Sequence, residues 1–148
     1  MSADVQVRLR VSGLAVRDGA FLAVEHAKDG RHYYLLPGGG VDAGERLTDG
    51  LVREFAEELG VRVKPGALLM ACDSIAPGKA RHIVHLVFAV EVEGEPRVTR
   101  DDERVVGCAW LTSDALASVD FYPDIAAWIG QALARPVQGA AVLAPEWK

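Results

Sequence analysis

The chain has 148 residues, of which 50% are hydrophobic and 25% are charged, and its formal net charge is −5. This length suffices for one domain with a buried core and is too short for two ordinary domains, so we expect a single domain over residues 1–148. The negative charge argues against polymeric nucleic acid as a partner, because phosphate contacts need a basic surface. A small phosphate ligand bound together with a metal ion remains compatible with this charge.

The sequence shows no sign of export or of membrane insertion. Its first eleven residues, MSADVQVRLRV, alternate between charged and apolar and predict neither a signal peptide nor a membrane span. Cys72 and Cys108 are too few for a disulfide framework and lack the spacing of a zinc site. We therefore expect reduced cysteines, a cytoplasmic location and no membrane partner.

Three strands are expected before residue 40. They cover residues 5–16, 20–24 and 33–36, and the first alternates apolar and polar side chains as a strand with one buried face does. Asp18 and Gly19 form a tight-turn pair between the first two strands. The polar residues 25–31 are expected to form a loop before the third strand.

A helix is predicted from about Thr48 to Leu59, with Gly60 as its C-terminal stop. Thr48 and Asp49 are the candidate caps. Apolar side chains recur every four positions and would face a core: Leu51, Phe55 and Leu59.

An acidic face on the same helix carries Glu54, Glu57 and Glu58. Like charges three or four residues apart repel by roughly 0.2–0.5 kcal/mol per pair, and the last helical turn favours cations over carboxylates. Arg53, four residues before Glu57, relieves part of this repulsion. A hard divalent ion held by several carboxylate oxygens would relieve more. Taken alone, such a cluster is also compatible with a solvated charged face.

A glycine triplet, Gly38 to Gly40, follows Pro37 and leads into this helix. Glycines let the backbone approach a ligand without an intervening side chain. The loop and the acidic face together predict an ion-binding site.

Nine positions between Gly39 and Val61 resemble the box of the Nudix hydrolase family. The family pattern is G-x5-E-x7-R-E-U-x-E-E-x-G-U, where U is aliphatic or a bulky apolar residue. The sequence matches every fixed position: Gly39, Glu45, Arg53, Glu54, Phe55, Glu57, Glu58, Gly60 and Val61. The resemblance implies an α/β fold, the Nudix αβα sandwich, with helices packed on a mixed central sheet. It also implies hydrolysis of a nucleoside diphosphate linked to another moiety.

The resemblance further implies a site for Mg2+ or Mn2+. Glu57 and Glu58 would be the principal ligands, Glu54 would complete the cluster or hold metal-bound water, and the Gly39 carbonyl would be a further ligand. This agrees with the chemistry, because a phosphoanhydride is a polyanion whose hydrolysis is helped by a metal that neutralises charge and activates water.

Three more residues receive roles from the resemblance. Arg53 would orient a box carboxylate, and Glu45 would brace the loop against the helix. The general base in this family comes either from the helix or from a later loop. Glu103 is the loop candidate, and a solvated loop charge is the equally compatible alternative.

The second half of the chain predicts more strands and two helices. Residues 61–74 predict strand, turn and strand around Pro65-Gly66, and residues 81–92 predict a central strand. The remaining expected elements are a strand at 105–111, a short helix capped at Thr112, a helix at 125–133, and a tail at 135–148 that is loosely packed or makes a homodimer contact.

Other polar residues are weaker candidates. His82 and His85 face opposite sides of one strand, and each is expected to be structural. Tyr33 and Tyr34 are candidates for stacking on a base, with core packing as the alternative. Three strand arginines are candidates for phosphate contacts or for solvated positions: Arg8, Arg10 and Arg81.

The substrate stays open between a nucleoside triphosphate, ADP-ribose and a nucleotide sugar. Pro77 lies sixteen residues after Val61, where family members that cleave ADP-ribose often carry proline, but proline also suits an ordinary turn. The alternative function is a nucleotide-binding sensor module that has lost catalysis. Such modules usually have substituted box glutamates, whereas all three are present here.

Overall fold

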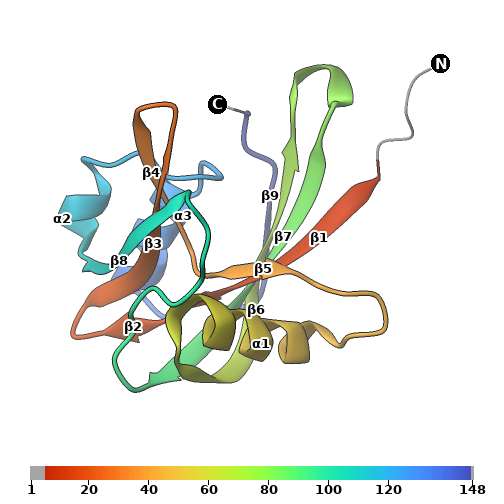
Figure 1. The fold of residues 1–148 in the computed structure, drawn as a ribbon. Coiled ribbons are helices and arrows are strands. Elements are labelled where there is room, and N and C mark those ends of the chain that lie inside the picture. Colours follow the sequence, from red (N-terminus) through yellow and green to blue (C-terminus); the bar gives the residue numbers. More distant parts are fainter. Residues whose placement is uncertain (1–5, 148) are drawn as a thin grey trace.

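A computed structural model of the chain describes residues 6–147 (Figure 1). In chain order its elements are β1 (Val7–Leu14), β2 (Val16–Arg17), β3 (Ala20–Lys28), β4 (Arg31–Leu35), β5 (Gly38–Gly40), α1 (Leu47–Leu59), β6 (Arg62–Ile75), the 3-10 helix η1 (Pro77–Lys79), β7 (His82–Glu93), β8 (Val105–Leu111), α2 (Ser113–Leu116), α3 (Ala126–Ala134) and β9 (Ala141–Leu143).

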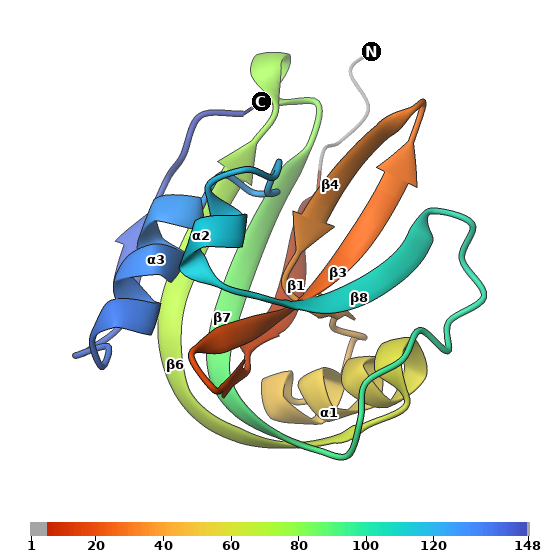
Figure 2. The ribbon, with the colours of Figure 1, turned by 90° about the vertical axis from the view of Figure 1, so that its left-hand side faces the viewer.

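The strands form two sheets. The larger sheet is mixed and has the order β5-β1-β7-β6-β9. Strand β1 runs parallel to β7, and β6 runs antiparallel to β7. In the smaller, antiparallel sheet, β3 pairs with β2, β4 and β8. Figure 2 shows α1 on one side of the molecule and α2 with α3 on the other. The expected α/β fold with a mixed central sheet and the central position of β7 are confirmed.

Helix α1 is packed tightly onto β1. Leu51, Phe55 and Leu59 are fully buried, as their spacing predicts. A Cβ atom on Gly13 of β1 would lie 2.8 Å from the Phe55 ring, so the helix fits only because this position lacks a side chain. Burying a side chain of this size stabilises a fold by roughly 1.5–3 kcal/mol. The contact also fixes the acidic face of α1 relative to the larger sheet.

The predicted loop at residues 25–31 is wrong. Strand β3 continues to Lys28 and returns as β4 through a second Asp-Gly turn, in which Asp29 has φ 52° and Gly30 has φ 77°. The predicted turn at Asp18 and Gly19 has almost the same geometry, with φ values of 53° and 77°. Both pairs supply the positive φ angles that a two-residue hairpin needs. The polar composition of residues 25–31 favours a loop, but the backbone pairing of β3 with β4 and β8 stabilises a hairpin instead.

The expectation of one buried face on β1 is also wrong. Val7 and Leu9 are 59% and 36% exposed, whereas Ser12 is 2% exposed. The strand projects beyond α1 at its amino-terminal end and is covered on both faces from Val11 onward (Figure 1). Val5, which the same prediction included, lies outside the described residues.

Residues 62–75 form one continuous strand, β6, instead of the predicted strand, turn and strand. The pairing of β6 with β7 shifts register between Pro65 and Leu68 and again before Met70. A bulge of this kind accommodates proline and glycine inside a strand, because the bulged residues leave the regular ladder.

The carboxy-terminal tail adds an edge strand. Residues 141–143 form β9, which runs parallel to β6 with Ala71 opposite Val142. This part of the tail is therefore held by backbone pairing. The other elements predicted for this half are confirmed, including the Thr112 cap, whose Oγ1 accepts a hydrogen bond of 3.2 Å from the Ala115 amide.

Candidate active site

The box helix begins without the side-chain cap that the sequence predicts. Its N-cap residue is Arg46, whose backbone is extended and whose side chain makes no capping hydrogen bond. Thr48 and Asp49 instead lie inside the first turn. At the other end, Gly60 has φ 64° and its amide donates to the Ala56 carbonyl, so the predicted glycine stop is confirmed.

Arg53 ties the loop to the helix. Its Nε and Nη2 each donate a hydrogen bond of 2.8 Å to Glu45, and Nη2 also donates to the Gly40 carbonyl at 3.0 Å. The Arg53 guanidinium and the Asp42 amide lower the pKa of Glu45 to about 2. These contacts join the glycine loop to the helix through Glu45, the residue to which the resemblance assigns that brace.

The same guanidinium orients two carboxylates of the acidic face. Nη1 of Arg53 lies 2.9 Å from Oε1 of Glu54 and 3.3 Å from Oε2 of Glu57. The expected pairing of Arg53 with the glutamate four residues later is therefore confirmed.

The glycine loop lies directly against the acidic face. Glu54 and Glu58 are 6% and 3% exposed, whereas the Glu57 side chain is 52% exposed. The Gly38 amide donates to Oε1 of Glu58 at 3.3 Å, and a Cβ atom on Gly39 would overlap the Glu54 carboxylate. Burial raises the pKa of Glu58, although nearby arginines oppose the shift.

Arg100 is a member of this site that the sequence did not indicate. Its guanidinium lies 2.5 Å from Glu54, 3.2 Å from Glu57 and 3.5 Å from Glu58. Arg100 belongs to the irregular segment between β7 and β8, 46 residues from Glu54. Neither helical spacing nor the box pattern contains information on a contact so distant in sequence.

The three glutamates have the oxygen chemistry that Mg2+ and Mn2+ prefer. Their side chains converge on one cation, the Arg100 guanidinium, which shows that a positive charge fits among them. Across residues 6–147, no group of three His, Cys, Asp or Glu side chains is already arranged to hold a metal ion. The donors therefore fit a divalent ion in chemical kind, and in the described structure their oxygens surround the larger Arg100 guanidinium.

Glu103 is exposed in a turn before β8. Within the described part of the chain, no hydrogen bond or ion pair joins it to the box. Its neighbour Asp102 pairs instead with Arg104 at 3.2 Å. The role of Glu103 as general base stays a prediction.

Arg10 of β1 lies beside the acidic face. It is partly buried, and its Nη2 donates to the Leu36 carbonyl at 3.0 Å. Burial lowers the pKa of Arg10, while the charges of Glu58 and Glu54 oppose this shift. Arg10 is thus a cation at the edge of the box and is not a solvated strand residue.

His85 faces Arg10 across the paired strands β1 and β7. It is 1% exposed, and neither ring nitrogen has a hydrogen-bond partner among residues 6–147. Burial, assisted by the charge of Arg10, lowers the pKa of His85 to about 3. His82 is in a different environment and contacts Asp73 at 2.9 Å.

We expect His85 to make the fold sensitive to mild acid. The unfolded chain takes up a proton near pH 6.5 and the folded chain only near pH 3, so this contribution is complete above pH 6.5 and is lost as the pH falls. The free energy of unfolding should decrease by about 1.4 kcal/mol per pH unit below pH 6. Urea unfolding between pH 7 and pH 5 measures the slope. His85→Leu should flatten the slope, and His32→Gln, at an exposed position of β4, should leave it unchanged. An unchanged slope in His85→Leu would contradict the assignment.

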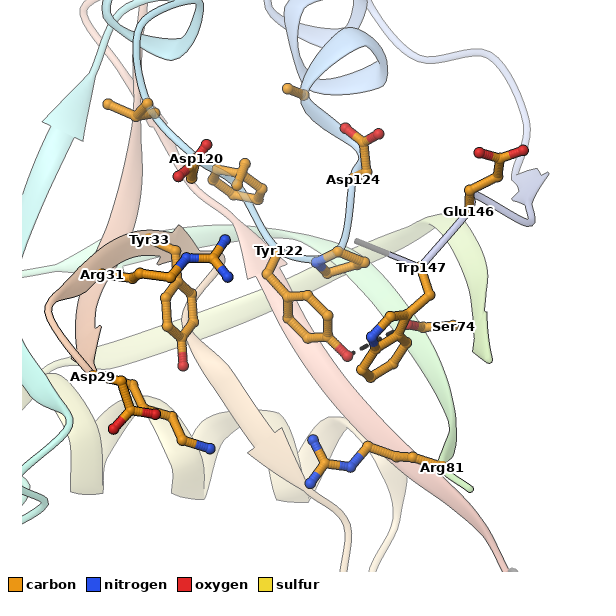
Figure 3. Close-up of a pocket in the computed structure, with 15 residues that line it drawn as sticks. Asp29, Arg31, Tyr33, Ser74, Arg81, Asp120, Tyr122, Asp124, Glu146 and Trp147 are labelled. Atoms are coloured by element: carbon orange, nitrogen blue, oxygen red, sulfur yellow. Dashed lines mark hydrogen bonds between the residues drawn. The ribbon is translucent and has the colours of Figure 1, made fainter. Parts of the chain in front are cut away.

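A cavity of about 530 Å³ lies between the tail, the Arg31 end of β4 and the segment before α3 (Figure 3), and one of its lining residues, Tyr122, contacts the ring of His85. Tyr33, Tyr122 and Trp147 bring aromatic rings to it, and Arg31 and Arg81 bring positive charge. The Tyr122 ring contacts His85 on one side and Trp147 on another, with centroid distances of 6.0 and 5.6 Å.

The two tyrosines of β4 have different surroundings. Tyr33 lines the cavity, whereas Tyr34 packs against the α3 core and donates to Glu25 at 2.9 Å. Trp147 comes from the tail beyond β9. The tail therefore forms part of the cavity wall, which the sequence did not predict.

Comparison with known proteins agrees with this architecture. The sequence model of the NUDIX domain matches residues 7–133, so the chain belongs to the Nudix family. Phosphatase NudJ of Escherichia coli (strain K12) is 28% identical over 99 residues, which cover 67% of this chain and 64% of that protein, just under two thirds of its length.

Solved structures show the same fold. A MutT NUDIX hydrolase from Burkholderia pseudomallei is similar with a TM-score of 0.65 and 33% identity, over 74% of this chain and 85% of that one. The E. coli ORF135 protein has a TM-score of 0.72 at 23% identity, over 90% and 96% of the two chains. None of the helices within residues 6–147 is long and apolar enough to cross a membrane.

Proposed function

We propose that this protein is a metal-dependent hydrolase that cleaves the pyrophosphate bond of a nucleoside diphosphate linked to another moiety. The observation that carries the proposal is the convergence of Glu54, Glu57 and Glu58 on one cation, directly against a glycine loop. Membership of the Nudix family and the names of the relatives, a phosphatase and a MutT hydrolase, support the hydrolase class. We propose one domain over residues 1–148.

In this proposal Glu57 and Glu58 are the principal ligands of Mg2+ or Mn2+, with Glu54 and the Gly39 carbonyl completing the site. A divalent ion bound there would neutralise phosphate charge and lower the pKa of a water molecule. Arg53 keeps Glu54 and Glu57 in place through its contacts with both. Glu103 or a glutamate of the helix receives the proton from the attacking water.

The cavity lined by Tyr33, Tyr122 and Trp147 supports a nucleotide as the substrate. Arg10 lies near Glu58 of the acidic face and near Tyr122, which lines the cavity. A phosphate chain that leaves the box at Arg10 would deliver the nucleoside to the rings of Tyr33, Tyr122 and Trp147. Aromatic rings bind bases by stacking, and arginine binds phosphate through paired hydrogen bonds.

Trp147→Ala should therefore raise KM by about tenfold, since stacking on one base contributes roughly 1–3 kcal/mol. The value of kcat should change little, because Trp147 lies in the tail and makes no contact with the box in the described structure. Steady-state kinetics with the preferred nucleotide separate the two constants. Trp147→Phe should restore most of the affinity, and an unchanged KM in Trp147→Ala would exclude this wall as a base contact.

The function is tested by separating and quantifying the nucleotide products that form from a panel of substrates: a nucleoside triphosphate gives a shorter nucleotide with pyrophosphate or phosphate, and ADP-ribose or a nucleotide sugar gives a nucleoside monophosphate with a sugar phosphate. Nucleoside triphosphates, nucleotide sugars, ADP-ribose and dinucleoside polyphosphates are each incubated with Mg2+, with Mn2+ and with EDTA. We expect turnover that requires the metal and favours one class. No turnover on any member, together with measurable nucleotide binding by the folded protein, would identify a sensor module instead.

A further inference from the structure

We propose that Arg100 is an internal counter-ion of the box carboxylates, which a divalent ion must displace to bind, so that this arginine sets the metal affinity. The inference rests on the metal site of the proposed function and adds a residue outside the box that controls it.

The Arg100 guanidinium uses the oxygens that the metal would need. Nη2 contacts Glu54 and Glu57, and Nη1 contacts Glu58. A cation already placed among carboxylates opposes the entry of a second cation, because it repels that ion and occupies its ligands. The two cations therefore compete for one site.

The backbone that carries Arg100 is anchored independently of this ion pair. The amides of Arg97 and Thr99 donate to the Leu59 and Glu58 carbonyls at 3.2 and 2.9 Å, and the Thr99 hydroxyl donates to the Glu57 carbonyl at 2.9 Å. These bonds satisfy carbonyls at the end of α1 that helix geometry leaves unpaired. The segment can thus stay docked on α1 while the Arg100 side chain rotates away from the carboxylates.

Arg53 touches two of the same glutamates but is held by other partners. Its two hydrogen bonds to Glu45 and one to the Gly40 carbonyl do not involve the acidic face, so they remain when a metal ion binds the glutamates. By contrast, every hydrogen bond and ion pair described for the Arg100 side chain ends on the three glutamates. A metal that takes these oxygens removes all of those partners, so Arg100 is the arginine that leaves.

The burial of two glutamates explains why a built-in counter-ion is useful. Glu54 and Glu58 are almost fully buried, and buried carboxylates are costly without a compensating positive charge. Removing Arg100 should therefore have two opposite effects. The variant should be less stable than the wild type in EDTA, and it should bind a divalent ion more tightly.

The test is the dissociation constant of Mn2+ without nucleotide, measured on the full chain by electron paramagnetic resonance. Arg100→Ala should bind Mn2+ about tenfold more tightly than the wild type. In this variant the metal no longer has to break several partly exposed ion pairs, whose combined free energy is of this order. Arg104→Ala is the matched control: it removes the same charge from the same segment, and its guanidinium pairs with Asp102. It should change the constant less than twofold.

Thermal unfolding of the same proteins provides the second readout. Arg100→Ala should unfold at a lower temperature than the wild type in EDTA, and Mn2+ should raise its Tm by more. Arg100→Gln, which removes the charge but keeps hydrogen-bond donors, repeats the measurement if the alanine variant does not fold. Arg100→Lys keeps the charge and should remain near the wild-type affinity.

The outcomes separate this inference from the proposed function. If Glu57→Gln weakens Mn2+ binding but neither Arg100→Ala nor Arg100→Gln tightens it, the counter-ion proposal is wrong and the metal site stands. If Glu57→Gln binds Mn2+ as the wild type does, the metal assignment is wrong and the counter-ion proposal fails with it. Binding of Mn2+ that appears only when Arg100 is replaced would support both.

Discussion

Glu57→Gln is expected to reduce metal-dependent turnover by about a thousandfold while the fold is preserved. Glutamine has nearly the same shape as glutamate but no charge, so the proposed site loses one anionic ligand, and loss of a single well-placed electrostatic group commonly lowers kcat by about 10²–10³. The Glu57 side chain is 52% exposed, so the substitution creates neither a cavity nor a buried polar group without a partner.

The measurement is kcat with the preferred nucleotide in Mg2+, together with the Tm of each protein in EDTA. Glu93→Gln, at an exposed position of β7, is the control for the change of charge and should keep wild-type turnover. Full activity in Glu57→Gln would overturn the assignment of this glutamate as a metal ligand.

Gly39→Ala is expected to lower turnover by about a hundredfold. The added methyl group would overlap the Glu54 carboxylate, which Arg53 and Arg100 hold on either side and which is 6% exposed. The carboxylate or the loop must therefore move, and a displacement of about 1 Å in an active site can reduce the rate by about 10²-fold.

Gly40→Ala is the matched control, because a Cβ atom there meets nothing within 4 Å. It adds the same methyl group to the next residue of β5 without touching a carboxylate. Turnover and Mn2+ affinity should both fall in Gly39→Ala and stay close to wild type in Gly40→Ala. Equal effects of the two substitutions would show that the glycines act through loop flexibility and not through the close approach at Gly39.

Local features of the chain were predictable because neighbouring residues determine them. The buried face of α1 follows from the spacing of Leu51, Phe55 and Leu59, and its end follows from Gly60. The turn at Asp18 and Gly19 needs only the left-handed conformations that this pair adopts readily. Membership of the Nudix family was predictable in the same way, since the box lies within one continuous stretch.

Features that depend on neighbours distant in sequence could not be predicted. Residues 25–31 form a hairpin because β3 has partners on both sides, and β6 runs through Pro65-Gly66 because β7 pairs along almost its whole length. The burial of Ser12 and the exposure of Val7 depend on which layers cover each end of β1. None of these neighbours is visible in a local pattern of polar and apolar residues.

The candidate site also combines features that neighbouring residues determine with features that depend on residues distant in sequence. The sequence by itself determined the shared face of the three glutamates and the glycine loop before them, because helix periodicity and short spacings bring these residues together. Its resemblance to the Nudix box implied that Arg53 orients a carboxylate and that Glu45 braces the loop. Only the tertiary structure decided that Arg100 lies among the glutamates, that the partly buried Arg10 lies opposite the buried His85, and that Trp147 lines the cavity. These contacts arise from packing between segments tens of residues apart, and such packing depends on the whole fold.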